Sequence, residues 1–211
     1  MIADKLFDLG LTAAQKLRYC VEIEGHPDNA SASLCGGFVV CCGFEDDVAQ
    51  SKGVPNVYAR KLPYSDKIKA VVAIPNFEVS TEKARQALPP TYSRADVVFN
   101  LQRVGLMAAA LTDDGIDEPS VVREAMKDKV HQPFRMHLVP GLQKCLALSS
   151  QNTPGVLGVC LSGSGSTILA LCRDNFSRVG ERMQALLQQA GVQCRTATLD
   201  IDQRGSLVQD F

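Results

Sequence analysis

The sequence has almost no excess charge of either sign. Its 211 residues include 22 Lys+Arg and 23 Asp+Glu, which gives a formal net charge of -1. This balance provides no electrostatic basis for binding nucleic acid or an anionic membrane surface, so we expect neither as the principal partner. The sequence also lacks the low hydrophobicity of disordered chains, since 45% of its residues are hydrophobic, and we expect a folded protein.

Long apolar runs are absent as well. Stretches such as Val71–Ile74 and Leu106–Leu111 are far shorter than the ~20 residues that cross a bilayer. The first residues, Met1–Lys5, include an acid where a secretory signal has its basic region, and no apolar core follows them. We therefore expect a cytoplasmic protein that does not span a membrane.

Cysteine pairs with metal-binding spacing are also missing. None of the eight cysteines forms a C-x-x-C pair, and most lie in apolar runs such as Val39–Cys42. We expect reduced thiols that pack as small hydrophobic side chains, with a zinc site as the alternative. The cysteines are Cys20, Cys35, Cys41, Cys42, Cys145, Cys160, Cys172 and Cys194.

The hydrophobic periodicity predicts alternating strands and helices. The predicted strands cover residues 37–42, 70–75, 156–161, 167–171 and 192–199, with a further edge strand within 45–68. The predicted helices cover residues 13–24, 81–88, 96–111, 119–130 and 176–190, with a short one near Pro140–Gly141. This order predicts an α+β domain whose antiparallel or mixed sheet is covered by helices on one side.

Local signals mark the predicted helix ends. Thr12 and Gln15 have the spacing of a capping box, and Ser80 is a suitable N-cap for the helix that follows it. Gly25 and Pro27 are expected to end the first of these helices before a polar turn.

The length of the chain corresponds to one large domain or about one and a half ordinary ones. The segment before residue 30 has a helix and a polar turn but no strand, so we expect it to belong to something placed before this domain.

A turn rich in glycine and hydroxyl groups, Ser162–Thr167, joins two predicted strands. Its consecutive amides could form an anion-binding nest, and a plain tight turn is the alternative. The turn is not a Walker A loop. Gly158 and Gly163 have the right separation, but Ser164 stands where that motif needs a lysine.

Polar side chains crowd the segment that follows the first predicted helix. Glu22, Glu24, His26, Asp28 and Asn29 lie within eight residues of one another. Carboxylates supply the hard oxygen ligands that Mg²⁺ prefers, so this set could hold a metal or a polar ligand. A solvated helix C-terminus is the alternative, although acidic groups there oppose the helix dipole.

Two arginines could clamp an anion. Thr81 and Arg85 are four residues apart and share one helix face. Together with Arg135, Arg85 could bind a carboxylate or phosphate bidentately, whereas each arginine taken alone is an ordinary surface residue. His131 and His137 flank the segment of Arg135, and the sequence does not distinguish catalytic from structural roles for them.

Five sequence blocks, in this order along the chain, resemble those of homoserine kinase. They are Glu24–Asn29 (EGHPDN), Gly36–Phe38 (GGF), Val79–Thr81 with Arg85 and Leu88–Pro89, His131–Arg135 (HQPFR) with Leu138–Gly141, and Leu161–Thr167 (LSGSGST). Segments 98–103 and 109–112 are most similar to the fungal branch. Homoserine kinases belong to the superfamily of galactokinase, mevalonate kinase and phosphomevalonate kinase.

The resemblance implies an activity and a domain organisation. The family transfers a phosphoryl group from MgATP to L-homoserine and yields O-phospho-L-homoserine for threonine biosynthesis, so the implied cofactors are ATP and Mg²⁺. The implied fold is a ferredoxin-like C-terminal substrate-binding domain at residues 35–211. Residues 1–34 then correspond to a remnant of the N-terminal ATP-binding domain, and a homodimer is implied by the family alone.

The resemblance also implies residue roles. Glu22 matches the glutamate near Mg²⁺, Asp28 and Asn29 match the catalytic polar cluster at the acceptor hydroxyl, and His26 lies beside them at the substrate. The implied contacts to homoserine are Thr81, Arg85, Arg135 and Gly163. The implied phosphate-binding residues are Ser162, Gly163, Ser164 and Gly165. Phosphoryl transfer depends chiefly on positioning and charge neutralisation, and this set contains no dedicated general base.

Two family features are missing from the sequence. The glycine-rich phosphate loop P-x-x-x-G-L-G-S-S-A, which starts a helix of the ATP-binding domain, is absent, as is the P-A-S-S-A-N segment. We therefore expect an N-terminally incomplete homoserine kinase with weak or absent activity. The alternative is a non-catalytic binding or regulatory subunit that associates with a full-length kinase.

Overall fold

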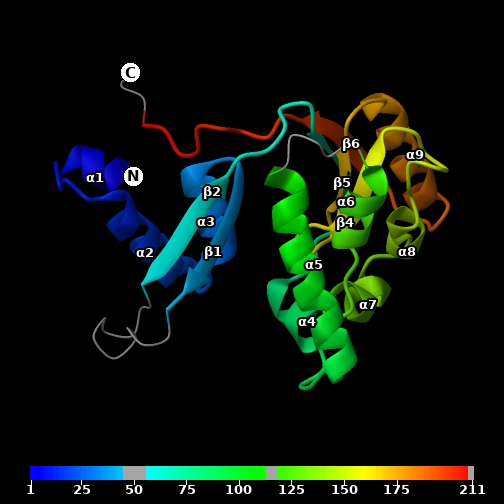
Figure 1. Ribbon diagram of the computed structural model, residues 1–211, viewed down its shortest axis with the longest axis horizontal. Coiled ribbons are helices and arrows are strands. Elements are labelled where there is room, and N and C mark those ends of the chain that lie inside the picture. Colours follow the sequence, from blue (N-terminus) through cyan, green and yellow to red (C-terminus); the bar gives the residue numbers. More distant parts are fainter. Residues whose placement is uncertain (45–55, 113–117, 209–211) are drawn as a thin grey trace. The chain divides into compact units, whose positions relative to one another are not determined.

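The computed structural model describes residues 1–44, 56–112 and 118–208 (Figure 1). The chain divides into two compact units. Unit 1 contains Met1–Tyr64 together with the segment that begins at Ile201, and unit 2 contains Ser65–Asp200. None of the described helices is long and apolar enough to span a membrane.

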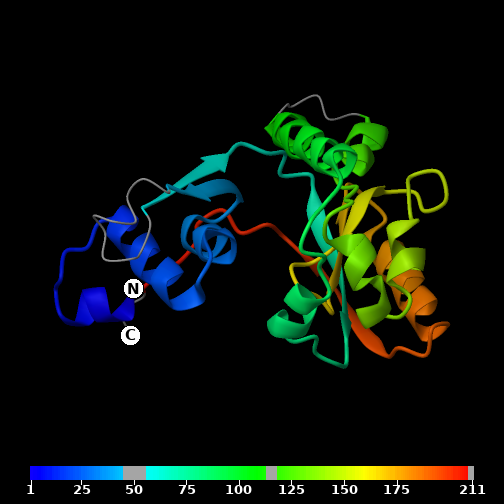
Figure 2. The ribbon, with the colours of Figure 1, turned by 90° about the horizontal axis from the view of Figure 1, so that it is seen from below.

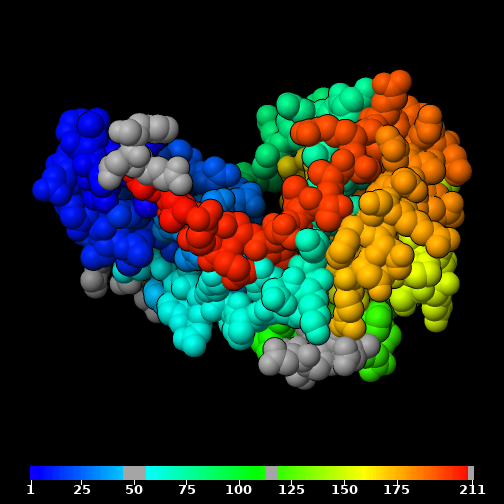
Figure 3. Space-filling model, turned by 90° about the horizontal axis from the view of Figure 1, so that it is seen from above, coloured from blue at the N-terminus to red at the C-terminus, as the bar shows by residue number. Residues whose placement is uncertain are grey.

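The described part of unit 1 contains three helices and two paired strands. The elements are α1 (Ile2–Leu6), α2 (Ala13–Glu24), α3 (Pro27–Cys35), β1 (Phe38–Gly43) and β2 (Val57–Leu62). The strands pair antiparallel, from Phe38 opposite Leu62 to Gly43 opposite Val57. The segment after residue 200 returns to this unit: the Gly37 amide donates to Asp202 O (2.6 Å), and the segment covers part of unit 1 in the space-filling view (Figure 3).

In the first part of unit 1, the predicted start of α2 is confirmed, but the polar turn predicted after α2 is wrong. The capping box is present, since the Thr12 hydroxyl accepts from the Gln15 amide (3.2 Å) and the Gln15 side chain accepts from the Thr12 amide (2.8 Å). Gly25 ends α2 in the left-handed conformation. The sequence predicts a polar turn next, but a helix, α3, begins directly at Pro27. Proline suits that first position because it has no amide to leave unpaired.

Unit 2 is built on a four-stranded antiparallel sheet with the strand order β4-β5-β3-β6. Its elements are β3 (Lys69–Pro75), α4 (Thr81–Gln86), α5 (Arg94–Thr112), α6 (Pro119–Ala125), α7 (Gln132–Arg135), the 3-10 helix η2 (Met136–Leu138), α8 (Leu142–Leu146), β4 (Val156–Leu161), β5 (Ile168–Cys172), α9 (Phe176–Gln188) and β6 (Cys194–Leu199). A β-α-β-β-α-β sequence with this strand order is the ferredoxin-like arrangement. The predicted α+β class is therefore confirmed.

Helices pack on both faces of this sheet (Figure 2). On one face, α8 and α9 cover a core that includes Val71, Val159 and Met183. Gly180 lets α9 approach closely, since a Cβ there would meet Thr196 Oγ1 at 3.3 Å. On the other face, a Cβ at Gly158 would meet the Met126 sulfur at 2.5 Å, so the end of α6 packs against β4. The prediction of helices on one side holds for α8 and α9 and is wrong for α6.

The other element bounds differ from the prediction at their ends. The helix predicted at 119–130 ends at Ala125 because Asp128 caps a separate helix, α7, directly after it. The edge strand expected within 45–68 is β2, although residues 45–55 lie outside the described residues. The chain passes from unit 1 to unit 2 between Tyr64 and Ser65, because β1 pairs with β2 inside unit 1. The functional assignment of the domains 1–34 and 35–211 stays a prediction.

Candidate functional site

The first group of predicted site residues lies in unit 1, where α3 begins. His26 is the N-cap of α3, Pro27 occupies its first turn, and Asp28 and Asn29 follow. Oδ1 of Asp28 accepts a hydrogen bond from the Asn29 amide (2.9 Å) and is also hydrogen-bonded to Nδ1 of His26. The start of α3 thus brings together three of the predicted polar residues, His26, Asp28 and Asn29.

The Asp28 carboxylate is held in its charged form by these neighbours. Partial burial opposes ionisation, but the Asn29 amide and the His26 ring outweigh it and lower the pKa of Asp28 below its usual value. Nε2 of His26 lies 3.8 Å from Oε1 of Glu24. A charged carboxylate at a helix N-terminus is also favoured by the helix dipole. The arrangement presents fixed hydrogen-bond acceptors to a polar ligand.

Glu22, the predicted Mg²⁺ ligand, lies on the exposed surface of α2. Across the described ranges, no group of three His, Cys, Asp or Glu side chains could hold a metal ion by itself. Mg²⁺ in phosphoryl-transfer sites is usually bound by one or two carboxylates, with water and substrate phosphates as its other ligands. A single exposed carboxylate fits a partial role of this kind.

The second group lies in unit 2 and is organised by Arg135. Its Nε donates to Ala84 O (3.1 Å), and its Nη1 donates to Gly163 O (3.1 Å). Ala84 is fully buried in α4 and precedes Arg85. The guanidinium therefore connects the helix that carries Thr81 and Arg85 with the glycine-rich turn. No described residue accepts a hydrogen bond from its Nη2, so that side of the guanidinium is available to an anion.

Helix α4 presents the other two predicted contacts to solvent. Ser80 caps it as expected, with its hydroxyl accepting from the Lys83 amide (3.2 Å). Thr81 and Arg85 are both exposed and share a face at the spacing of one helical turn. Their side chains are positioned by the helix and not by one another.

The turn between β4 and β5 has some features of an anion-binding loop. Gly163 and Gly165 have φ values of +57° and +89°, which glycine adopts without strain. The Gly165 amide donates to Ser162 O (3.0 Å), and the Ser166 hydroxyl donates to Phe77 O (2.5 Å). Within the described chain, neither the Gly163 nor the Ser164 amide donates a backbone hydrogen bond. These two free amides are where an oxyanion would bind.

Asp128 supports the second group and was not singled out from the sequence. Its Oδ2 accepts from the amides of His131 (2.8 Å) and Gln132 (2.5 Å), at the start of α7. Its Oδ1 accepts from Nδ2 of Asn100 (2.7 Å) on α5. Burial opposes ionisation here, but these hydrogen bonds, that of Asn100 foremost, lower the pKa of Asp128. Asp128 therefore fixes the helix that carries Arg135.

Gln132 is the second supporting residue that sequence reasoning missed. It is 8% exposed, and its Oε1 accepts from the Leu161 amide (2.8 Å), directly before the glycine-rich turn. Thus α7 holds the turn twice, by Gln132 at its start and by Arg135 at its end. The sequence carries no signal for this role, because Gln132 stands in a polar segment and its burial follows only from the packing of α7 against β4.

The two histidines near this segment are peripheral. His137 is exposed, and His131 is exposed with Nδ1 3.8 Å from Oδ1 of Asp128.

The cysteines, which were expected to be reduced, are free thiols. Burial raises the pKa of Cys145 and Cys172 to about 12, as expected for thiols that pack as small apolar side chains.

Comparisons with known proteins show similarity to kinases of one family. The family model described as GHMP kinases C terminal matches residues 107–189. The homoserine kinase of Schizosaccharomyces pombe is 41% identical over 100% of this chain and 68% of its own length. The homoserine kinase of Candida albicans is 34% identical over 99% of this chain and 67% of its own length. Both are fungal, in line with the expected branch.

A solved structure shows the same fold. The crystal structure of homoserine kinase from Cytophaga hutchinsonii superposes with a TM-score of 0.79 at 25% identity, over 96% of this chain and 62% of that one. L. major mevalonate kinase in complex with R-mevalonate has a TM-score of 0.63 at 16% identity, which indicates a shared fold. The chain spans about two thirds of the length of the relatives it matches.

Proposed function

This chain belongs to the homoserine kinase family, and on that premise we propose that it binds L-homoserine as the phosphoryl acceptor of an ATP-dependent kinase. The reaction would yield O-phospho-L-homoserine in threonine biosynthesis, in the cytoplasm. The observation that carries the proposal is Arg135, whose guanidinium is fixed by Ala84 O and Gly163 O and keeps Nη2 available. Such a preset guanidinium suits a carboxylate that must be held in one orientation.

Homoserine is a zwitterion with one hydroxyl, so its site needs three kinds of partner. Arg135 and Arg85 would bind its carboxylate, with Thr81 and the Gly163 backbone as further contacts. Asp28, which is charged and oriented by His26, would accept from the ammonium group or the hydroxyl. Asn29 would orient the homoserine hydroxyl for phosphoryl transfer, and this role needs only a correctly positioned side chain.

ATP and Mg²⁺ would be bound by the two sets of residues that the resemblance assigns to them. The free amides of Gly163 and Ser164 support the proposal that Ser162–Gly165 contacts a phosphate. Glu22 would be one ligand of Mg²⁺, which, when bound with ATP, neutralises charge on the phosphates. The sequence contains no glycine-rich loop of the family's N-terminal type, so we expect weak nucleotide binding and weak or absent turnover for this chain.

Turnover is tested with the purified chain, MgATP and L-homoserine in a coupled assay of ADP release. We expect a rate far below the ~1–100 s⁻¹ of ordinary kinases. A rate within that range would show that the missing loop is not required. The assay leaves the question of homoserine binding to a separate measurement.

Binding is tested by calorimetric titration of L-homoserine into the wild type and into Arg135→Met. We expect the variant to bind at least about tenfold more weakly, because the charged hydrogen-bond donor for the carboxylate is lost. Arg85→Met should also bind more weakly, and it leaves the turn anchored. Arg178→Met, at an exposed position of α9, is the control and should bind as the wild type does. Equal affinity of all four proteins would contradict the proposed site.

Homoserine binding at Arg135 does not by itself require turnover, so a second candidate function is that of a non-catalytic binding or regulatory subunit. A chain that binds homoserine but not ATP would act as a binding or regulatory subunit of a full-length kinase. Homoserine binding without detectable ADP release, together with co-purification with a full-length family member, would support it. The homodimer implied by the family is tested by sedimentation of the same samples.

A further inference from the structure

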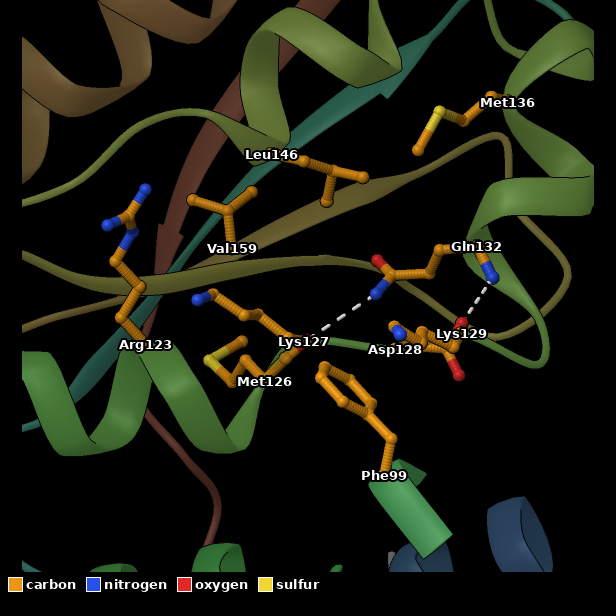
Figure 4. Close-up of a pocket in the computed structure, with 10 residues that line it drawn as sticks. All are labelled: Phe99, Arg123, Met126, Lys127, Asp128, Lys129, Gln132, Met136, Leu146 and Val159. Carbon is orange, nitrogen blue, oxygen red and sulfur yellow. Dashed lines mark hydrogen bonds between the residues drawn. The ribbon is translucent and has the colours of Figure 1, made fainter. Parts of the chain in front are cut away.

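A pocket of about 240 Å³ lies in unit 2, on the side of α7 that faces α5 and α6 (Figure 4). Phe99 of α5, Met126 and Arg123 of the α6 region, and Leu146 of α8 contribute to its wall, and Val159 of β4 lies at its back. None of the residues assigned above to homoserine, ATP or Mg²⁺ lines it. Two residues of its wall, Gln132 and Asp128, hold the glycine-rich turn and the helix of Arg135 in place, so the pocket adjoins the proposed homoserine site without sharing a ligand contact with it.

The wall of the pocket is mainly apolar and adaptable. Met126 and Met136 have flexible thioether side chains, which adjust to ligands of different shape. Leu146 and Val159 close one side, and the Phe99 ring reaches the pocket from the opposite side (Figure 4). The volume is somewhat below the ~300–1,000 Å³ of drug-sized sites, so the pocket suits a small molecule with a compact apolar body.

One buried donor points to a polar group on that molecule. The Gln132 side chain faces the pocket (Figure 4), and its Oε1 is used by the Leu161 amide. Its Nε2 has two hydrogens, and the bond from Nε2 to Met126 O is long, at 3.4 Å. A buried amide with unused donor capacity favours an acceptor oxygen beside it.

The charges at the rim favour an anion. Three cations, Arg123, Lys127 and Lys129, line the pocket together with one carboxylate, Asp128, whose oxygens are already occupied by four donors.

Two of the three cations are already paired. Lys127 is paired with Glu124, and Lys129 lies 3.4 Å from Asp96 and 4.6 Å from the Phe99 ring centroid. Within the described ranges Arg123 forms no ion pair, so it is the cation left for a ligand.

We propose that this pocket binds a small organic monocarboxylate whose apolar body packs between Met126, Met136 and Leu146, and whose carboxylate is bound by Arg123. The site is separate from the proposed homoserine site and does not depend on it.

Benzoate is a suitable probe, and benzyl alcohol is a neutral probe with the same ring. Each is titrated into the isotope-labelled full chain, and the amide shifts of residues 126–136 and 159 are followed by NMR. We expect saturable shifts with benzoate, with a Kd on the order of 1 mM for a ligand of this size, and much weaker shifts with benzyl alcohol.

Variants separate this site from unspecific binding. Arg123→Met keeps the apolar stem and should weaken benzoate binding about five- to tenfold, while Arg178→Met should leave it unchanged. Leu146→Phe fills part of the volume and should weaken both probes. Saturating L-homoserine should leave benzoate bound.

Several outcomes would overturn the proposal. They are shifts without saturation, equal affinity of Arg123→Met and Arg178→Met, unchanged binding by Leu146→Phe, and displacement of benzoate by L-homoserine. Because these readouts follow benzoate, a failure of homoserine binding would refute the proposed kinase function and leave this proposal standing.

Discussion

The two units differ in how they are held together. In unit 2 a four-stranded sheet and its helices enclose a contiguous core, with Met183, Leu187 and Ile168 fully buried. Among the described residues of unit 1, the buried hydrophobic side chains are Leu17 and Val21, while Ile23 of the same helix is 87% exposed. Hydrophobic burial is the main stabilising term of folding, so unit 2 should carry most of the chain's stability.

This difference matters for the proposed function. Arg135 and the glycine-rich turn are fixed to the sheet of unit 2 through Gln132 and Asp128, so their geometry is set before any ligand binds. Asp28 and Asn29 are fixed chiefly by the start of one nine-residue helix. The proposed carboxylate-binding residues of unit 2 are therefore better preorganised than Asp28 and Asn29 of unit 1, and binding by preorganised groups loses less entropy.

The largest expected effect separates the two units directly. Leu187→Ala removes a fully buried side chain from the core of unit 2 and should lower the free energy of unfolding by about 2–5 kcal/mol. Ile23→Ala, in unit 1, should change it by less than about 0.5 kcal/mol because the side chain is exposed. Urea unfolding followed by circular dichroism measures both. Equal costs would contradict the contrast between the units.

A smaller loss is expected at Asp128. Asp128→Ala leaves the Asn100 amide and the first amides of α7 without an acceptor, and should cost about 1–3 kcal/mol in urea unfolding. Asp66→Ala, at an exposed carboxylate of unit 2, is the matched control and should cost less than about 0.5 kcal/mol.

The contribution of Asp128 depends on pH with a defined sign. Its pKa is lowered in the folded state, so the stabilisation is present above the unfolded pKa of about 3.9 and is lost as the pH falls through the folded value. The difference between the wild type and Asp128→Ala should therefore be constant from about pH 5 upward and shrink below about pH 4. A difference that grows on acidification would mean that Asp128 is not held as a carboxylate.

A local effect is expected at Gln132. Gln132→Met preserves volume but removes the acceptor of the Leu161 amide, and should cost about 1–2 kcal/mol. Hydrogen exchange at Leu161 should become about tenfold faster, and homoserine binding should weaken because the turn is released. Gln184→Met, on the surface of α9, serves as the control. Unchanged exchange at Leu161 would show that Gln132 does not anchor the turn.

The smallest effect concerns the thiols. Cys42 of unit 1 is exposed, whereas Cys145 and Cys172 of unit 2 are fully buried, with pKa values raised to about 12 by burial. Iodoacetamide at pH 7 should modify Cys42 and leave the buried pair unmodified until urea unfolds unit 2. Mass spectrometry of the digested protein reports this, and early labelling of Cys145 would indicate that the core opens.

Features with a local cause could be predicted from the sequence. The capping box at Thr12, the end of α2 at Gly25 and the strands around Val71 and Val159 depend on nearby residues and on apolar patterns. The ferredoxin-like arrangement came from the resemblance, and the strand order confirms it. The helix start at Pro27 was missed because a proline that ends one helix also suits the first turn of the next.

The supporting residues of the site depend on contacts between distant parts of the chain. Gln132 and Leu161 are 29 positions apart, and Asn100 and Asp128 are 28 apart. No periodicity or spacing indicates such pairs, since they form only when the sheet and helices have packed. For the same reason, the sequence predicts Arg135 as a candidate anion-binding residue but not its hydrogen bonds to Ala84 and Gly163.

Hydrogen exchange of the full chain, measured without and with saturating L-homoserine, tests most directly the claim that unit 2 is the stable, preorganised part of a homoserine-binding protein. The account predicts that amides of Val71–Ala73 in β3 exchange far more slowly than those of Leu17–Val21 in α2 in both samples. It also predicts that L-homoserine slows exchange in Ser162–Gly165. Equal protection of β3 and α2, or exchange at Ser162–Gly165 that L-homoserine does not change, would contradict it.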